Sequence, residues 1–172
     1  IETEVQEAPP DPHTIQLEAL EALSQTRVLG NKAGLVVLAT GLGKTWLAAF
    51  DTSSSSDYKR VLFVAHREEI LSQAMNTFRI IKPEAHLGKY TGLERSISAE
   101  LVFASVQTLS RKEHLENFET NEFDYIIIDE FHHAAARTYR KIIDYFEPKF
   151  LLGLTATPER TDGRDLLGLC GE

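Results

Sequence analysis

The stretch Val36-Val37-Leu38-Ala39-Thr40-Gly41-Leu42-Gly43-Lys44-Thr45 decides the fold of this chain. A short apolar run typical of a strand passes through a glycine-containing turn into a segment with helical character. Glycines let backbone N–H groups approach phosphate oxygens, and the following helix points its positive end at the same anion. Lys44 can then reach the β- and γ-phosphates, and Thr45 can bind Mg²⁺. The alternative is an ordinary strand–turn–helix, because Leu38 stands where a full phosphate loop has glycine.

Length and composition set the class of protein. The chain has 172 residues, enough for one domain with a real core. Its formal net charge of −8 argues against a protein that coats nucleic acid by bulk charge, although a local basic patch stays possible. No apolar run approaches the ~18 residues of a membrane span, and the acidic N-terminus does not resemble a signal peptide. The single Cys170 rules out an internal disulfide and favours a cytoplasmic location.

The order of predicted elements gives the fold class. Residues 1–13 contain three prolines and several acids, and we expect an extended leader there. A helix is expected to begin at Thr14, and the segment 30–34 breaks the chain before the first strand. The remaining predicted strands and helices alternate: strands 35–39, 60–65, 87–91, 100–104, 125–128 and 150–154; helices 44–50, 68–80, 106–117 and 138–146. This rhythm predicts an α/β domain whose mostly parallel sheet has helices on both faces.

Polar residues follow four of the predicted strands. Ligands bind beyond the carboxyl ends of the strands in such sheets, so these residues should share one site. They are Thr40 to Thr45, His66-Arg67, Asp129-Glu130 and Thr155-Ala156-Thr157.

Asp129 and Glu130 end the most strongly β stretch, Tyr125 to Ile128. Hydrolysis of ATP needs an acid that holds Mg²⁺ and a group that positions the attacking water. Asp129 suits the first role and Glu130 the second. A strand that merely ends in solvated acids is the alternative. His132 and His133 raise the further alternative of a metal cluster, but their spacing does not match a helical zinc site.

Four segments in order resemble motifs I, Ia, II and III of superfamily 2 helicases. They are Ala39 to Thr45, Ala65-His66-Arg67-Glu68-Glu69-Ile70-Leu71, Asp129-Glu130-Phe131-His132 and Leu154-Thr155-Ala156-Thr157-Pro158. The DExH form and the Thr-Ala-Thr triplet are most similar to the bacterial branch that includes restriction-enzyme motor subunits. The resemblance covers about residues 14–160 and implies the first RecA-like lobe of a P-loop ATPase.

The resemblance also implies roles for individual residues. ATP would be bound by Gln16, which would read adenine, together with Thr40, Gly41, Leu42, Gly43, Lys44 and Thr45. Nucleic-acid backbone would be contacted by His66, Arg67, Ser105, Gln107 and Thr108. His132, Thr155 and Thr157 would couple the nucleotide state to that surface, because the motif III strand of this family lies between those of motifs I and II. From the residues alone, Gln16 could be a solvated helix residue, and Ser105 and Thr108 could be helix caps.

Such a helicase has two RecA-like lobes, and the arginine finger belongs to the second. We expect residues 161–172 to lead toward that lobe, and the 172-residue chain by itself to bind Mg-nucleotide weakly and barely turn it over. The whole protein is expected to move on nucleic acid, DNA more than RNA, with no membrane partner. A nucleotide-dependent switch or scaffold without unwinding is the alternative, and a P-loop kinase for a small molecule is disfavoured. His13, His86 and His114 are expected at the surface, and Trp46 in the core.

Overall fold

The computed structural model describes residues 14–38, 41–55, 57–130 and 137–156. The strands are β1 (Ala33–Val37), β2 (Val61–Ala65), β3 (Leu87–Tyr90), β4 (Leu101–Ser105), β5 (Tyr125–Asp129) and β6 (Phe150–Thr155). The helices are α1 (Thr14–Val28), α2 (Gly41–Ser53), α3 (Glu68–Ile81), α4 (Val106–Leu109), α5 (Lys112–Leu115) and α6 (Arg137–Tyr145).

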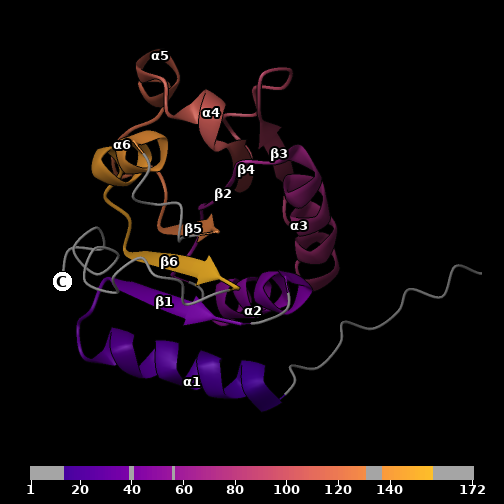
Figure 1. Cartoon of the computed structure of the whole chain (residues 1–172), viewed down its shortest axis with the longest axis vertical. Coiled ribbons are helices and arrows are strands. Elements are labelled where there is room, and N and C mark those ends of the chain that lie inside the picture. Colours follow the sequence, from indigo (N-terminus) through magenta and orange to yellow (C-terminus); the bar gives the residue numbers. More distant parts are fainter. Residues whose placement is uncertain (1–13, 39–40, 56, 131–136, 157–172) are drawn as a thin grey trace, which may run out of the picture.

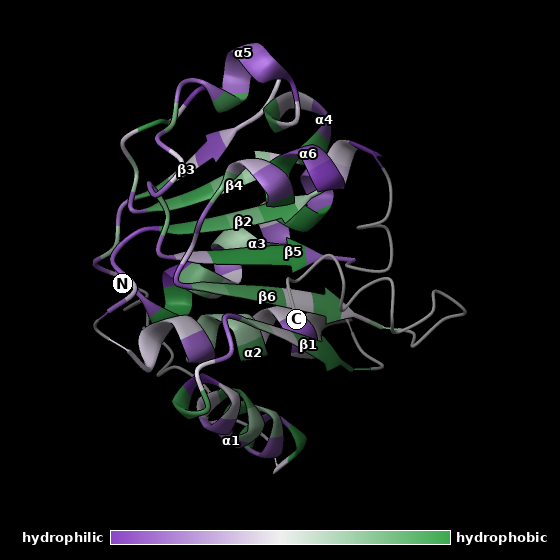
Figure 2. Ribbon diagram, turned by 90° about the vertical axis from the view of Figure 1, so that its left-hand side faces the viewer, coloured by the Kyte–Doolittle hydropathy of each residue, from purple (hydrophilic) through white to green (hydrophobic). Residues whose placement is uncertain are grey.

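The strands form one six-stranded sheet in the order β1-β6-β5-β2-β4-β3. Every pairing is parallel, which confirms the predicted α/β class. β6, which carries the motif III segment, lies between β1 and β5, as the family resemblance implied. The carboxyl ends of all six strands therefore point to one edge (Figure 2).

Helices cover the sheet on both faces (Figure 1). The helices α1, α2 and α3 pack on one face, against alternate strand residues such as Phe63 and Ile127. The helices α4, α5 and α6 pack on the other, against the intervening residues such as Val64 and Ile128. Because the central strands are buried on both faces, they read as continuous apolar runs, and Figure 2 shows them as the most hydrophobic elements.

The first strand begins two residues earlier than the sequence predicted, at Ala33. The prediction treated Gly34 as part of a break, but Gly34 belongs to the strand. A Cβ atom there would lie 2.9 Å from Leu23 Cδ2 and 3.2 Å from Phe150 Cζ. The glycine thus allows α1 and the Phe150 ring to approach the strand closely.

Two predicted helices have different limits. α2 begins at Gly41, three residues before the predicted start, although glycine is a poor helix former. The burial of Leu47, Ala48 and Ala49 against the sheet outweighs that preference. The predicted helix 106–117 is split into α4 and α5. Leu109 and Leu115 are both buried, yet six residues would place them about 120° apart on one continuous helix, so a break lets both face the core.

None of the helices in the described ranges combines the length and the apolar character needed to cross a membrane.

Candidate functional site

The strand register brings the sequence-predicted residues together. Val37 pairs with Thr155 on β6, and Leu154 of β6 pairs with Asp129 on β5. β5 is also paired with β2, where Ala65, the last residue, is level with Ser105 on β4. Adjacent strands lie about 4.8 Å apart, so the four predicted clusters leave the sheet side by side along one edge.

Lys44 and Asp129 form the centre of this edge. Lys44 Nζ lies 3.6 Å from Asp129 Oδ1, and both side chains are almost completely buried. Lys44 occupies the first turn of α2, and Asp129 ends β5. Burial raises the pKa of the Asp129 carboxyl, while the Lys44 ammonium opposes the rise and the charge of Glu130 adds to it. The phosphate-binding segment and the Asp129-Glu130 segment, far apart in the sequence, are therefore one electrostatic unit.

Glu130 follows β5 with an unusual backbone. Its φ of 58° is the one positive value among the described residues other than glycine. The left-handed region costs a residue with a Cβ atom about 1 kcal/mol or more, and such residues cluster at functional sites. The strand ends at this point, between Asp129 and Glu130.

Oxygen donors suited to Mg²⁺ lie at the same place. Thr45 is buried in the first turn of α2, next to Lys44, and Asp129 provides a carboxylate. Mg²⁺ prefers such hard oxygens and takes only one or two of them from protein when nucleotide phosphates supply the rest. Thr45 and Asp129 therefore fit the metal role predicted for them.

Gln16 connects α1 to the phosphate-binding loop. Its side chain is buried, and its Nε2 donates a hydrogen bond to the Gly43 carbonyl oxygen at 3.1 Å. The solvated-residue alternative for Gln16 is therefore wrong. Its role in adenine reading stays a prediction.

The residues predicted to contact nucleic acid lie at the ends of β2 and β4. Arg67 is exposed and precedes α3, and Gln107 Nε2 donates to the His66 carbonyl oxygen at 2.9 Å. Ser105 ends β4 and occupies the N-cap position of α4, as the capping alternative predicted, but its hydroxyl makes no capping hydrogen bond. Ser105 is buried, whereas Gln107 is exposed and Thr108 is half-buried.

Three predicted site residues lie outside the described residues: Thr40, His132 and Thr157. Thr155, by contrast, is buried, and its carbonyl oxygen accepts a hydrogen bond from Leu38 N at 3.0 Å. This bond ties the end of β6 to the start of the phosphate-binding loop. Gly41 and Leu42 form the first turn of α2.

Two other expectations need correction. His114 is not an isolated surface histidine, because its Nδ1 lies 2.8 Å from the buried Tyr90 hydroxyl, which also accepts from Asn117. Trp46 is half-buried rather than a core residue and packs beside Phe50, with ring centroids 6.0 Å apart.

The sequence interpretation missed Tyr139. This residue of α6 is buried, and its hydroxyl lies 3.4 Å from His66 Nδ1. Burial, followed by the charges of Asp129 and Glu130, raises the pKa of its phenol. The amphipathic pattern of the helix predicts a buried aromatic side chain there, but no motif indicates its hydroxyl contact.

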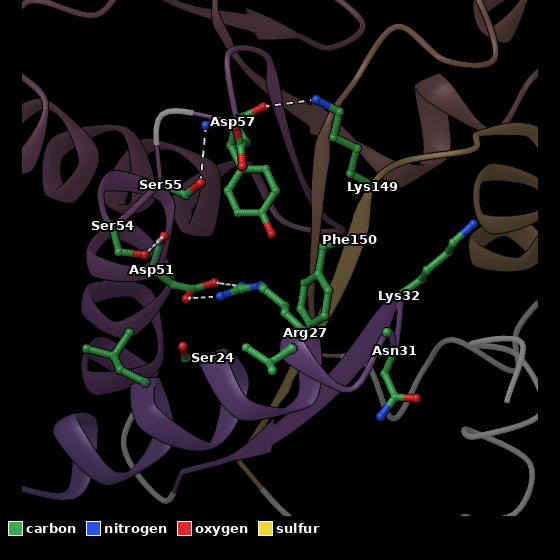
Figure 3. A pocket seen from close by; sticks show the side chains of 14 residues that line it. Ser24, Arg27, Asn31, Lys32, Asp51, Ser54, Ser55, Asp57, Lys149 and Phe150 are labelled. Atoms are coloured by element: carbon green, nitrogen blue, oxygen red, sulfur yellow. Dashed lines mark hydrogen bonds and ion pairs between the residues drawn. The ribbon is translucent and has the colours of Figure 1, made fainter.

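A pocket of about 580 Å³ opens at the opposite edge, near the amino ends of β1 and β6 (Figure 3). Two of its charged groups bind each other: Arg27 of α1 donates two hydrogen bonds to the Asp51 carboxylate of α2. The buried Tyr125 hydroxyl donates to the same carboxylate at 2.5 Å, and the Arg27 guanidinium lies 4.3 Å from the centre of the Phe150 ring. We call Arg27, Asp51 and Tyr125 the α1–α2 clamp, because they fasten the helix that carries Gln16.

Comparison with known proteins identifies the family. Residues 10–160 match the model of the "Type III restriction enzyme, res subunit" family. The chain belongs to this family. It has the fold and motif order of the first RecA-like lobe of superfamily 2 helicases, which confirms the resemblance seen in the sequence.

Individual relatives agree with this family. The chain is 36% identical over 171 residues to IRC3 of Saccharomyces cerevisiae, a protein named as a candidate ATP-dependent helicase, with 88% of this chain and 24% of IRC3 covered. It is 31% identical over 153 residues to the DNA 3'-5' translocase XPB2 of Sulfurisphaera tokodaii, with 87% and 33% covered. The solved SWI2/SNF2 ATPase core of Sulfolobus solfataricus in complex with dsDNA has the same fold, with a TM-score of 0.75, 19% identity, and coverage of 95% and 36%. The chain thus spans between about a quarter and just over a third of the length of these proteins.

Proposed function

We propose that this chain is the ATP-binding lobe of a nucleic-acid-dependent ATPase that couples ATP hydrolysis to movement on DNA. The observation that carries the proposal is the buried contact between Lys44 and Asp129, 3.6 Å apart, on the sheet edge that also carries His66. A structural ion pair alone would not require a glycine-containing first helical turn, Gly41-Leu42-Gly43, beside it. That combination is suited to a bound nucleotide triphosphate.

Each residue of the centre has one role. Lys44 binds the β- and γ-phosphates, and the first turn of α2 offers its unpaired N–H groups to the same anion. Thr45 and Asp129 hold Mg²⁺, which neutralises charge on the phosphate oxygens. Glu130, whose left-handed backbone follows directly on Asp129, positions the attacking water. Gln16, fixed to the loop through Gly43, reads the adenine ring.

The nucleic-acid surface follows β2 and β4. The exposed Arg67 and the Gln107–Thr108 turn contact backbone phosphates, which gives affinity with little sequence preference. DNA is favoured over RNA because the family is named for a restriction enzyme and a translocase among the relatives is named for DNA.

A second RecA-like lobe completes the site. The chain spans only part of its relatives, so the second lobe would belong to the intact protein. That lobe contributes an arginine that stabilises the transition state, a contribution typically of ~10³–10⁵ in rate. We infer that this lobe by itself binds Mg-nucleotide weakly and turns it over slowly.

The test is an ATPase assay on the intact protein with and without DNA. Glu130→Gln should bind a fluorescent ATP analogue as the wild type does, while DNA-stimulated turnover falls by ~10²–10⁴. Glu122→Gln is the matched control and should keep full activity. Glu122 pairs with Arg60 near the amino ends of β2 and β5, at the opposite edge of the sheet. Normal DNA-stimulated turnover in Glu130→Gln would refute the role of Glu130. Displacement of a triplex-forming strand, measured alongside, separates movement on DNA from a stationary switch.

A further inference from the structure

Tyr139 is the one aromatic residue of α6 whose hydroxyl points to the site edge. Its side chain is 3% exposed, and its hydroxyl oxygen lies 3.4 Å from His66 Nδ1. Tyr139 and His66 are 73 residues apart in sequence, so the contact joins two segments that the fold alone brings together. A phenylalanine would fill the same space in the core, so packing does not explain the hydroxyl.

The loop that carries His66 is held at two points. Gln107 Nε2 donates to the His66 carbonyl oxygen at 2.9 Å and fixes the backbone. The Tyr139 hydroxyl meets the imidazole and fixes the ring. These contacts come from two different helices, one from α4 and one from α6. Together they limit both the position and the orientation of the histidine.

The surroundings of Tyr139 keep its hydroxyl protonated. Burial and the negative charges of Asp129 and Glu130 raise the pKa of the phenol. A protonated phenol can donate to Nδ1 or accept from it, and either bond holds the imidazole ring of His66 in one orientation. The phenol is also close enough to the two acids for their charges to act on it.

We propose that Tyr139 is a positioning residue for nucleic-acid binding, which orients the His66 imidazole toward a backbone phosphate. The inference rests on the proposed function, because the contact of His66 with nucleic acid belongs to it. Tyr139 touches neither the nucleotide nor the phosphate in this scheme and acts through His66.

The same helix offers a matched control. Tyr145 is on α6 as well, and its hydroxyl donates to the Phe118 carbonyl oxygen at 2.5 Å. Phe118 belongs to the core cluster and not to the strand ends. Removal of either hydroxyl deletes one hydrogen bond from the same helix, but only one of them is at His66.

The experiment compares Tyr139→Phe and Tyr145→Phe in the intact protein by titrating ATPase activity with duplex DNA. For Tyr139→Phe we expect the half-saturating DNA concentration to rise about 3- to 10-fold, the range of one lost hydrogen bond. The rate at saturating DNA and the KM for ATP should change less than about twofold, because ATP binds elsewhere on the edge. Tyr145→Phe should leave the half-saturating DNA concentration unchanged. An equal rise in both variants would overturn the inference, since a general loosening of α6 would then explain it.

A double-mutant cycle with His66→Ala distinguishes the role of Tyr139 from the nucleic-acid contact proposed for His66. In the His66→Ala background, Tyr139→Phe should have no further effect on the half-saturating DNA concentration, because its target is absent. If the fold-changes of the two substitutions in the half-saturating DNA concentration multiply in the double variant, Tyr139 does not act through His66 and the inference is wrong. If His66→Ala weakens DNA use and Tyr139→Phe does not, the inference alone fails. If His66→Ala leaves DNA use unchanged, the nucleic-acid role proposed for His66 fails first.

Discussion

Replacement of Arg27 by alanine would leave the Asp51 carboxylate of the α1–α2 clamp without its cation. Asp51 is 1% exposed and would keep one neutral partner, the Tyr125 hydroxyl at 2.5 Å. Removal of one member of a buried ion pair costs about 3–5 kcal/mol. The remaining hydrogen bond and the partial exposure of Arg27 favour the lower end of that range. Loss of the guanidinium above the Phe150 ring adds about 0.5–1 kcal/mol, so we expect a total of about 3–4 kcal/mol.

Urea unfolding of the 172-residue chain, followed by the emission of its single tryptophan, measures this cost. The midpoint should fall with little change in slope, and the melting temperature should fall by about 10 °C. Arg140→Ala is the matched control, because Arg140 forms an ion pair with Asp144 in which both side chains are more than half exposed. Such surface pairs contribute about 0–1 kcal/mol. If Arg27→Ala were no more destabilising than Arg140→Ala, the reasoning about the clamp would be refuted.

Three further predictions concern other parts of the chain. Lys44→Ala should lower ATP turnover of the intact protein at least ~100-fold in a coupled assay, and a rate within tenfold of the wild type would contradict the phosphate-binding role. Gly88→Ala should destabilise the lobe by about 1–3 kcal/mol in thermal unfolding, because its Cβ would lie 2.4 Å from Ser96 Cβ, whereas Gly92→Ala meets no atom within 4 Å and should be neutral. His114→Ala should lower the free energy of unfolding by about 1 kcal/mol in the same measurement, because it removes a partner of the buried Tyr90 hydroxyl. An unchanged midpoint would show that the contact between His114 and Tyr90 does not stabilise the lobe.

Local patterns predicted the layout of the sheet. Strands buried on both faces, such as Val61–Ala65, are continuous apolar runs, whereas amphipathic helices have apolar residues only at every third or fourth position. The clusters at their carboxyl ends were identified because parallel strands place those ends at one edge. The four motifs in order then indicated the family, and the strand order with β6 between β1 and β5 agrees with it.

The differences arose where distant contacts outweigh local preference. Gly34 belongs to a strand because Leu23 and the Phe150 ring need the space above it, and neither lies next to it in the sequence. The break between α4 and α5 allows both Leu109 and Leu115 to be buried in the core. Histidines were the hardest residues to place: His114 contacts Tyr90, which lies 24 residues away. Tyr139 could not be assigned a role because its hydroxyl meets His66 only after the whole sheet has formed.

The left-handed backbone of Glu130 has a consequence for the evolution of this lobe. Glycine or asparagine accepts a φ of 58° more readily than glutamate does, so either substitution would relieve strain at the tip of β5. A laboratory selection for thermal stability alone would therefore favour variants at the position that we assign to water activation. Thermal stability and catalytic turnover therefore favour different residues at this position. Engineering for stability that is meant to preserve activity should keep Glu130 and introduce substitutions elsewhere.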